Sequence, residues 1–194
     1  MYALRAKIKD EGRAINGAIL KVDGFINHRV DAALMEQCGA TFARRFVDLK
    51  PDIVLTAEIS GIAPALMTGA ALGCAVVYAR KKRPVTMHQG AYVASAPSRT
   101  KGGEPCPLIV SPEFLKTGER VLIIDDFLAS GQTILGLIEL CRQANATIVG
   151  VGALVEKTFE NGRDTLRNAL VDGQPIETLA QITSLEDGIV EVAP

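Results

Sequence analysis

The chain has 194 residues, of which 48% are apolar and 22% charged, and its formal net charge is −1. This length suits one domain with a sizeable core, so we treat 1–194 as a single domain. Nucleic-acid binding needs basic surface to neutralise phosphates, and the densest basic run, Arg80-Lys-Lys-Arg83, is too short for that. The first twelve residues lack an apolar core, and every apolar run falls short of the roughly 20 residues of a spanning helix. We therefore expect no nucleic-acid partner, no membrane partner, no signal peptide and a cytoplasmic location.

The cysteine pattern argues against a metal centre built by the chain itself. The four cysteines are each more than thirty residues from the next, and there are only two histidines to help them. Neither metal-ligand nor redox spacing occurs, so we expect reduced thiols and no direct metal ligands.

The N-terminal part predicts two helices. Leu4 and Ile8, with charges between them, indicate a short amphipathic helix ended by Gly12. A polar stretch without periodicity continues to His28. Asp31 is expected to cap a second helix. Its apolar positions recur at helical spacing and are Leu34, Met35, Cys38, Phe42 and Phe46.

Strands and helices then alternate. The apolar runs predict strands at 53–56, 75–78, 121–124 and 147–155, with helices at 63–72 and about 133–144. Continuous apolar strands separated by helices imply an α/β fold with a mostly parallel twisted sheet covered on both faces. Such a sheet binds ligands at the carboxyl ends of its strands.

Residues 80–116 interrupt this alternation. Six prolines and glycines fall between Pro97 and Pro112, and the periodicity is weak. A long loop or ragged hairpin inside a compact domain is usually functional, so we predict a flexible lid; a floppy surface insertion is the alternative. Tyr92, Ser95 and Lys101 are candidates for contacts made by the closed lid.

The strongest chemical signal is Val121-Leu-Ile-Ile-Asp-Asp-Phe-Leu-Ala-Ser-Gly-Gln-Thr133. A buried strand leads into the acid pair Asp125 and Asp126, then into a loop of small residues and a helix. The backbone N–H groups of such a loop and the helix N-terminus bind phosphate, and Ser130 and Thr133 can add hydroxyl donors. Neither a Walker A loop nor a Gly-x-Gly-x-x-Gly motif is present. A paired acid alone is usually a cap or a solvated turn, but the whole arrangement indicates a phosphorylated sugar with a divalent metal nearby.

This segment resembles the signature of the type I phosphoribosyltransferases. Its residues 125–132, Asp-Asp-Phe-Leu-Ala-Ser-Gly-Gln, are similar to those of the members that use xanthine in bacterial purine salvage. The likeness runs through nearly the whole chain and includes Leu20-Lys-Val-Asp-Gly-Phe-Ile-Asn-His28, Glu58-Ile-Ser-Gly-Ile-Ala-Pro64, Tyr78-Ala-Arg-Lys81 and Val155-Glu-Lys-Thr-Phe159. It implies the type I fold, with a small hood made by about 1–35 and C-terminal residues, and the lid at about 80–116.

The resemblance implies roles for the phosphate-binding residues. Asp125 and Asp126 would face the ribose hydroxyls as the catalytic acids, and the 5-phosphate would be held by Ala129, Ser130, Gly131, Gln132 and Thr133. Ser60-Gly61 would form the pyrophosphate loop, which in this fold often carries a strained or cis peptide; from spacing alone such turns are common. Arg80 and Lys81 would bind the pyrophosphate, in the related adenine enzymes across a homodimer interface. A solvated basic turn is the alternative for them.

The resemblance also implies the base pocket. Leu20, Asn27 and Lys157 would contact the purine, and Phe159 could stack on its face. Ammonium and amide donors suit the carbonyl oxygens of xanthine. Without the family, Lys157 is an ordinary strand-end lysine and Asn27 a turn residue.

The implied reaction transfers the 5-phosphoribosyl group from phosphoribosyl pyrophosphate to xanthine, giving xanthosine 5′-monophosphate and pyrophosphate. Mg²⁺ would bind mainly through the substrate. The sequence offers no convincing nucleophile and leaves the general base open. Two alternatives remain: transfer to hypoxanthine, guanine or adenine, and a regulator that senses phosphoribosyl pyrophosphate, which would need a nucleic-acid-binding module or a basic face.

Overall fold

A six-stranded sheet forms the centre of the protein. The computed structural model describes residues 1–87, 90–97, 105–171 and 173–194. The strand order is β10-β9-β8-β7-β3-β4, and every neighbouring pair is parallel except β9 and β10. The strands are β3 (Ile53–Ala57), β4 (Ala75–Ala79), β7 (Arg120–Leu128), β8 (Thr147–Lys157), β9 (Ile176–Ser184) and β10 (Glu191–Val192). The predicted α/β fold with a mostly parallel sheet is confirmed.

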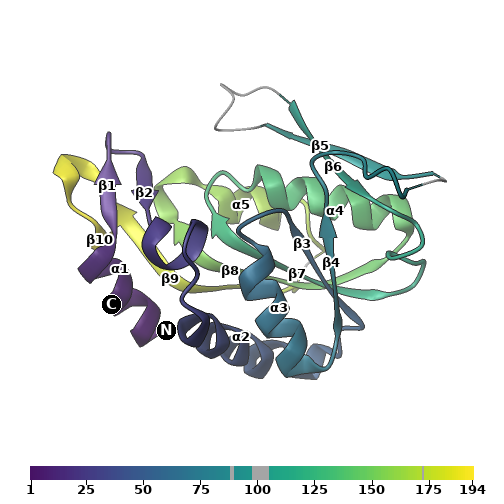
Figure 1. Cartoon of the computed structure of the whole chain (residues 1–194), viewed down its shortest axis with the longest axis horizontal. Coiled ribbons are helices and arrows are strands. Elements are labelled where there is room, and N and C mark those ends of the chain that lie inside the picture. The colour runs from purple at the N-terminus through teal and green to yellow at the C-terminus, as the bar shows by residue number, and fades with distance from the viewer. Residues whose placement is uncertain (88–89, 98–104, 172) are drawn as a thin grey trace.

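Helices cover both faces of this sheet (Figure 1). On one face lie α2 (Ala32–Phe46) and α3 (Ile62–Leu72), and on the other lie α4 (Gln132–Ala144) and α5 (Gly162–Arg167). Asp31 caps α2 as predicted, because its Oδ1 accepts a hydrogen bond from the Leu34 N–H at 3.1 Å. Each face has its own apolar core, one against α2 and the other against α4.

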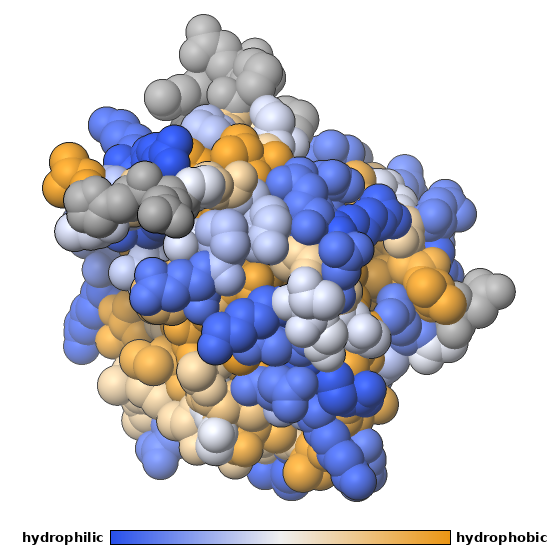
Figure 2. Space-filling view, turned by 90° about the vertical axis from the view of Figure 1, so that its right-hand side faces the viewer, coloured by the Kyte–Doolittle hydropathy of each residue, from blue (hydrophilic) through white to orange (hydrophobic). Residues whose placement is uncertain are grey.

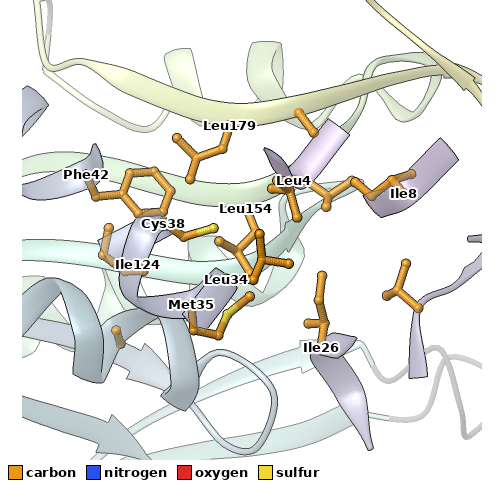
Figure 3. Close-up of a cluster of buried hydrophobic side chains, with 14 of the residues drawn as sticks. Leu4, Ile8, Ile26, Leu34, Met35, Cys38, Phe42, Ile124, Leu154 and Leu179 are labelled. Atoms are coloured by element: carbon orange, nitrogen blue, oxygen red, sulfur yellow. The ribbon is translucent and has the colours of Figure 1, made fainter. Parts of the chain in front are cut away.

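The core under α2 also binds the N-terminal part of the chain to the sheet. Figure 3 shows side chains of α1 (Tyr2–Glu11), α2 and three strands meeting in this cluster, among them Leu4, Ile8, Met35, Phe42, Ile124, Leu154 and Leu179. We use the name hood for residues 1–28 and the segment around β10. The stretch between α1 and His28 is not irregular as the sequence suggested, because it contains the hairpin β1 (Arg13–Ile15) and β2 (Ile19–Lys21) and a π-helix, Asp23–Asn27.

The segment expected to be a lid contains an antiparallel hairpin, β5 (Tyr92–Pro97) and β6 (Pro105–Val110). The hairpin packs into the apolar core against α4, and hydrogen bonds also join it to the rest of the fold. Arg80 and Ile109 form a β-bridge, and the Gln143 side chain on α4 exchanges two hydrogen bonds with the backbone of Val93, each 3.0 Å. The base of this segment is therefore a hairpin, one of the two forms that the sequence led us to expect. Its predicted contact residue Lys101 lies outside the described residues.

Two further expectations concern the whole chain. Across the described ranges, no helix is long and apolar enough to cross a membrane. All four cysteines are free thiols, and burial raises the pKa of Cys38 and of Cys141 to about 12. Those two thiols are therefore neutral at physiological pH. Short 3-10 helices complete the described structure, at Val47–Leu49, Thr158–Glu160 and Glu186–Gly188.

Candidate functional site

A cavity of about 750 Å³ opens at the carboxyl ends of β3, β7 and β8. The hood forms one wall, and β5 and β6 form another. This is the edge at which α/β sheets bind ligands. Most residues singled out from the sequence line this one cavity: Leu20, Asn27, Ser60, Lys81, Asp125, Asp126, Ala129, Ser130, Gly131, Gln132, Thr133 and Lys157.

Both residues of the acid pair line the cavity. Asp125 is only 4% exposed, and its Oδ1 accepts a hydrogen bond from the Asp126 N–H at 3.0 Å. Burial and, after it, the neighbouring charge of Asp126 raise the pKa of Asp125 well above its usual value. A ligand that brings positive charge or hydroxyl donors beside the pair would offset this unfavourable charge. The pair is thus suited to a hydroxyl-bearing ligand that carries a cation.

An anion cradle follows the acid pair directly. β7 ends at Leu128, and α4 begins at Gln132 with Gly131 as its N-cap in the left-handed region, φ 81°. The first N–H groups of a helix have no partner within the helix, and its N-terminus attracts negative charge. The loop rests on α5, because a side chain on Gly162 would collide with the carbonyl oxygen of Ala129. The chain from 129 to 133 therefore has the backbone that phosphate binding requires.

The turn after β3 meets the acid pair. It includes a cis peptide between Glu58 and Ile59, and Ile59 directly precedes the predicted Ser60-Gly61 loop. A Cβ on Gly61 would collide with the Thr56 hydroxyl and would lie 2.6 Å from Asp125 Oδ1. Thr56 is fully buried, and within the described part of the chain its hydroxyl has no hydrogen-bond partner. Two motifs found separately in the sequence thus pack against each other, and only glycine fits where they touch.

The two basic residues after β4 have different positions. Lys81 lines the cavity, and its backbone N–H donates to Glu58 Oε1 at 2.6 Å. Arg80 is not among the described lining residues; its Nε lies 2.9 Å from Glu58 Oε2, and its guanidinium is 5.6 Å from the centre of the Tyr78 ring. Glu58, which the sequence did not single out, therefore holds Arg80 and the backbone of Lys81 together.

Lys157, the last residue of β8, lines the cavity beside the hood. Its side chain is about 6% exposed, and its ammonium group donates to the carbonyl oxygen of Ala18 in the hood at 2.6 Å. Glu160 Oε1 is 3.3 Å away, and the centre of the Phe127 ring is 6.0 Å away. Leu20 and Asn27 of the hood line the same end. A buried cation, an amide and an aromatic ring together suit a planar ring with carbonyl oxygens.

The aromatic residue at this end differs from the one that the resemblance suggested. Phe159 is 41% exposed in the 3-10 helix Thr158–Glu160 and is not among the described residues that line the cavity. Phe127, directly after the acid pair, lines it instead.

Comparison with known proteins assigns the chain to a family. Residues 31–168 match the phosphoribosyl transferase domain. The chain is 50% identical over 188 residues to a xanthine phosphoribosyltransferase of Deinococcus deserti, covering 97% of this chain and 95% of the relative. It is 45% identical over 190 residues to a xanthine phosphoribosyltransferase of Bacillus cytotoxicus, covering 98% and 94%.

Solved structures have the same fold. An adenine phosphoribosyltransferase from Rhodothermus marinus superposes with a TM-score of 0.73 at 21% identity, covering 94% of this chain and 100% of that one. The adenine phosphoribosyltransferase of Trypanosoma brucei, solved with AMP, pyrophosphate and ribose-5-phosphate, gives a TM-score of 0.70 at 22% identity, covering 92% and 79%. At this level of identity the likeness is one of fold.

Proposed function

The chain belongs to the phosphoribosyltransferase family, and we propose that it transfers the 5-phosphoribosyl group from phosphoribosyl pyrophosphate to xanthine in purine salvage. The products are xanthosine 5′-monophosphate and pyrophosphate. The observation that carries this proposal is that three groups line one cavity: the anion cradle of 129–133, the acid pair, and the buried ammonium of Lys157 beside the hood. The xanthine phosphoribosyltransferases to which the chain is 45–50% identical over nearly its whole length support xanthine as the base.

Each part of the cavity has a task in this reaction. The 129–133 loop binds the 5-phosphate through backbone N–H groups and the hydroxyls of Ser130 and Thr133. The acid pair accepts hydrogen bonds from the ribose hydroxyls and stabilises the positive charge that develops on the sugar as the bond to pyrophosphate breaks. The departing pyrophosphate binds to Ser60, Gly61 and Lys81. Arg80 supports this site indirectly, because Glu58 contacts both Arg80 and the backbone of Lys81. Binding and alignment of both substrates supply most of the rate, because no covalent intermediate is needed.

The purine is oriented from the other end. The Lys157 ammonium and the Asn27 amide are donors for its carbonyl oxygens, and Leu20 and Phe127 pack against the ring. Xanthine has one more carbonyl oxygen than hypoxanthine. A cationic donor at this position therefore favours xanthine, and it offsets negative charge on the base during attack.

The residues present fit a Mg²⁺ ion carried by the substrate. In the described part of the chain, no three His, Cys, Asp or Glu side chains converge to hold a metal. Mg²⁺ keeps most of its waters and commonly binds one or two carboxylates together with substrate phosphates, a role open to Asp125 and Asp126. When bound, the ion would neutralise charge on the pyrophosphate.

We also propose that the enzyme is a cytoplasmic homodimer. The side of the molecule formed by α3 and the edge strand β4 exposes large apolar side chains, among them Ile59, Leu66 and Tyr78 at 75%, 52% and 42%. Figure 2 shows apolar surface gathered on part of this side. A patch of this kind beside Arg80 and Lys81 supports a partner subunit that covers it, next to the pyrophosphate end of the cavity.

The proposal is tested by mixing the protein with Mg²⁺, phosphoribosyl pyrophosphate and each purine separately, and measuring nucleotide by chromatography. We expect xanthosine 5′-monophosphate at the highest rate, and we expect Asp126→Asn to slow the reaction whichever purine is used. A preference for guanine or hypoxanthine would show that the proposed substrate is wrong while the chain is still a phosphoribosyltransferase. No nucleotide with any purine would exclude the enzymatic function and favour a sensor of phosphoribosyl pyrophosphate.

A further inference from the structure

An ion pair with a buried carboxylate and a partly exposed arginine lies outside the cavity, on the α4 side of the sheet. Glu156 of β8 is 3% exposed, and both of its carboxylate oxygens bind Arg163 of α5, from Nε to Oε1 at 2.8 Å and from Nη2 to Oε2 at 2.6 Å. Thr178 and Gln181 of β9 also donate to Oε2, at 2.9 and 3.0 Å. Arg163 Nη1 donates to the carbonyl oxygen of Ile176 at 2.8 Å. The pair thus joins α5 to two strands through a two-pronged contact.

The carboxylate is fully supported in its ionised form. Burial alone disfavours the charge, but the hydrogen bonds of Arg163 and Thr178 outweigh it and hold the pKa of Glu156 below its ordinary value. A buried ion pair is weak evidence for stability by itself, because desolvation cancels much of the attraction. The arrangement therefore raises the question of what it positions.

Glu156 and Arg163 flank the short segment 157–162, and each end of this segment lies beside the cavity or the loop that lines it. Lys157, directly after Glu156, lies at the purine end. Gly162, directly before Arg163, lies under the phosphate loop: a Cβ there would collide with the Ala129 carbonyl oxygen and would lie 2.9 Å from Leu128 Cδ1. A Cβ on Gly131 would in turn lie 3.2 Å from the Gly162 carbonyl oxygen. The backbone at 162 is therefore the platform on which the anion cradle rests.

The sheet register places the pair at the point where this cradle begins. Glu156 is the register partner of Leu128, the last residue of β7 before the loop, and of Gln181 on the other side. Lys157 has its own attachments, to Ala18 and Glu160, whereas the described side-chain hydrogen bonds from α5 to β8 and β9 are made by Arg163. Loosening the pair should thus displace the phosphate loop more than the purine end.

We propose that Glu156 and Arg163 are positioning residues for the 5-phosphate loop, acting through Gly162. This inference depends on the proposed function only because that function identifies the bound substrate as phosphoribosyl pyrophosphate. The pair sets the affinity for the phosphoribosyl group and leaves purine affinity nearly unchanged.

The test compares Glu156→Gln with Asp164→Asn, a control on the same helix that removes an exposed carboxylate paired with Arg167. Glu156→Gln should raise the KM for phosphoribosyl pyrophosphate about tenfold, equivalent to about 1.4 kcal/mol. It should weaken ribose 5-phosphate binding in calorimetry by a similar factor and change the KM for xanthine less than about twofold. The control should match the wild type in all three. Where Glu156→Gln does not fold, Thr178→Val, which removes one donor and leaves the ion pair, should give the same pattern with a smaller effect.

The outcomes separate this inference from the proposed function. A merely structural role would lower the fraction of active protein, and hence the apparent kcat, without moving either KM. Unchanged ribose 5-phosphate affinity in the folded variants, or equal rises in both KM values, would overturn the inference while the enzymatic function stands. A wild type that makes no nucleotide but binds ribose 5-phosphate more tightly than the variants would leave the inference intact and remove the proposed function.

Discussion

Replacing Lys157 with methionine separates the attachment of its side chain to the hood, which the structure shows, from its proposed contact with xanthine. The ammonium group donates to the Ala18 carbonyl oxygen of the hood at 2.6 Å and lies 6.0 Å from the Phe127 ring at the purine end. Methionine keeps most of the apolar stem and removes the charge. Loss of the bond to Ala18 should affect every purine equally, because it acts on the hood, whereas loss of the contact to the additional oxygen should affect xanthine alone.

The size of the xanthine-specific loss follows from the strength of a charged hydrogen bond. Such a bond contributes about 1.5–3 kcal/mol, and each 1.36 kcal/mol is a factor of ten in rate. We therefore expect Lys157→Met to lower kcat/KM for xanthine about 10- to 150-fold more than kcat/KM for hypoxanthine. Initial rates at saturating phosphoribosyl pyrophosphate give both values for each base.

The control is Lys21→Met, which removes an exposed lysine of the same hood that lies 3.8 Å from Asp23. It should leave both values unchanged, since exposed ion pairs contribute little. Equal losses for xanthine and hypoxanthine in Lys157→Met would refute the specificity role and leave only the attachment of the hood.

Three further substitutions test other parts of the site. Gly61→Ala brings a Cβ against the Thr56 hydroxyl and Asp125, so it should lower the free energy of unfolding by about 1–3 kcal/mol, as measured by urea titration. The control Gly24→Ala should leave the free energy of unfolding unchanged, because a Cβ there meets nothing nearer than 3.8 Å. Equal losses in the two variants would argue against close packing at Gly61. Because the pKa of Asp125 is raised on folding, its ionisation opposes folding as pH rises above the unfolded value of about 3.9. Asp125→Asn should therefore lose activity yet have a higher Tm at neutral pH; a lower Tm would contradict this. The pKa of Glu156 is lowered, so its contribution to stability is present above the unfolded value of about 4.3 and is lost as pH falls through the folded value. Denaturant titrations at about pH 6 and about pH 3 should show that the free energy of unfolding falls less between these two pH values in Glu156→Gln than in the wild type.

The sequence predicted the parts of the fold in which local signals and tertiary structure agree. The helix after Asp31 has both a capping side chain and apolar residues at helical spacing, and the structure confirms both. The apolar runs of β3 and β7 could be buried only in a covered parallel sheet. The segment from Asp125 to Thr133 was identifiable because its acids, small residues and helix start are contiguous in the chain.

Elements too short or too polar for periodicity were missed. β1 and β2 have three residues each, too few to show alternation, and their hairpin is held by packing of Leu20 into the core. β9 mixes Glu177, Thr178 and Gln181 with apolar residues, and two of these polar side chains serve the buried Glu156. Their place in the fold depends on a partner more than twenty residues away in sequence, which no local pattern reveals.

The site residues that the sequence left out depend on tertiary placement. Glu58 reads as an ordinary turn acid, and its role arises only because β3 and β4 end side by side, which brings it to Arg80 and Lys81. Phe127 and Phe159 were equally plausible ring partners by residue type. Which of them reaches the cavity is set by the length of β7 and by the 3-10 helix after β8.

A competition experiment tests the proposed activity most directly. Xanthine, hypoxanthine and guanine are supplied together at equal concentrations with Mg²⁺ and limiting phosphoribosyl pyrophosphate, and the three nucleotides are quantified by chromatography. Their ratio equals the ratio of the kcat/KM values, whatever the total rate. Xanthosine 5′-monophosphate should be the dominant product in the wild type and should lose that dominance in Lys157→Met. A wild type that makes mainly guanosine or inosine monophosphate, or no nucleotide at all, would contradict the proposed function.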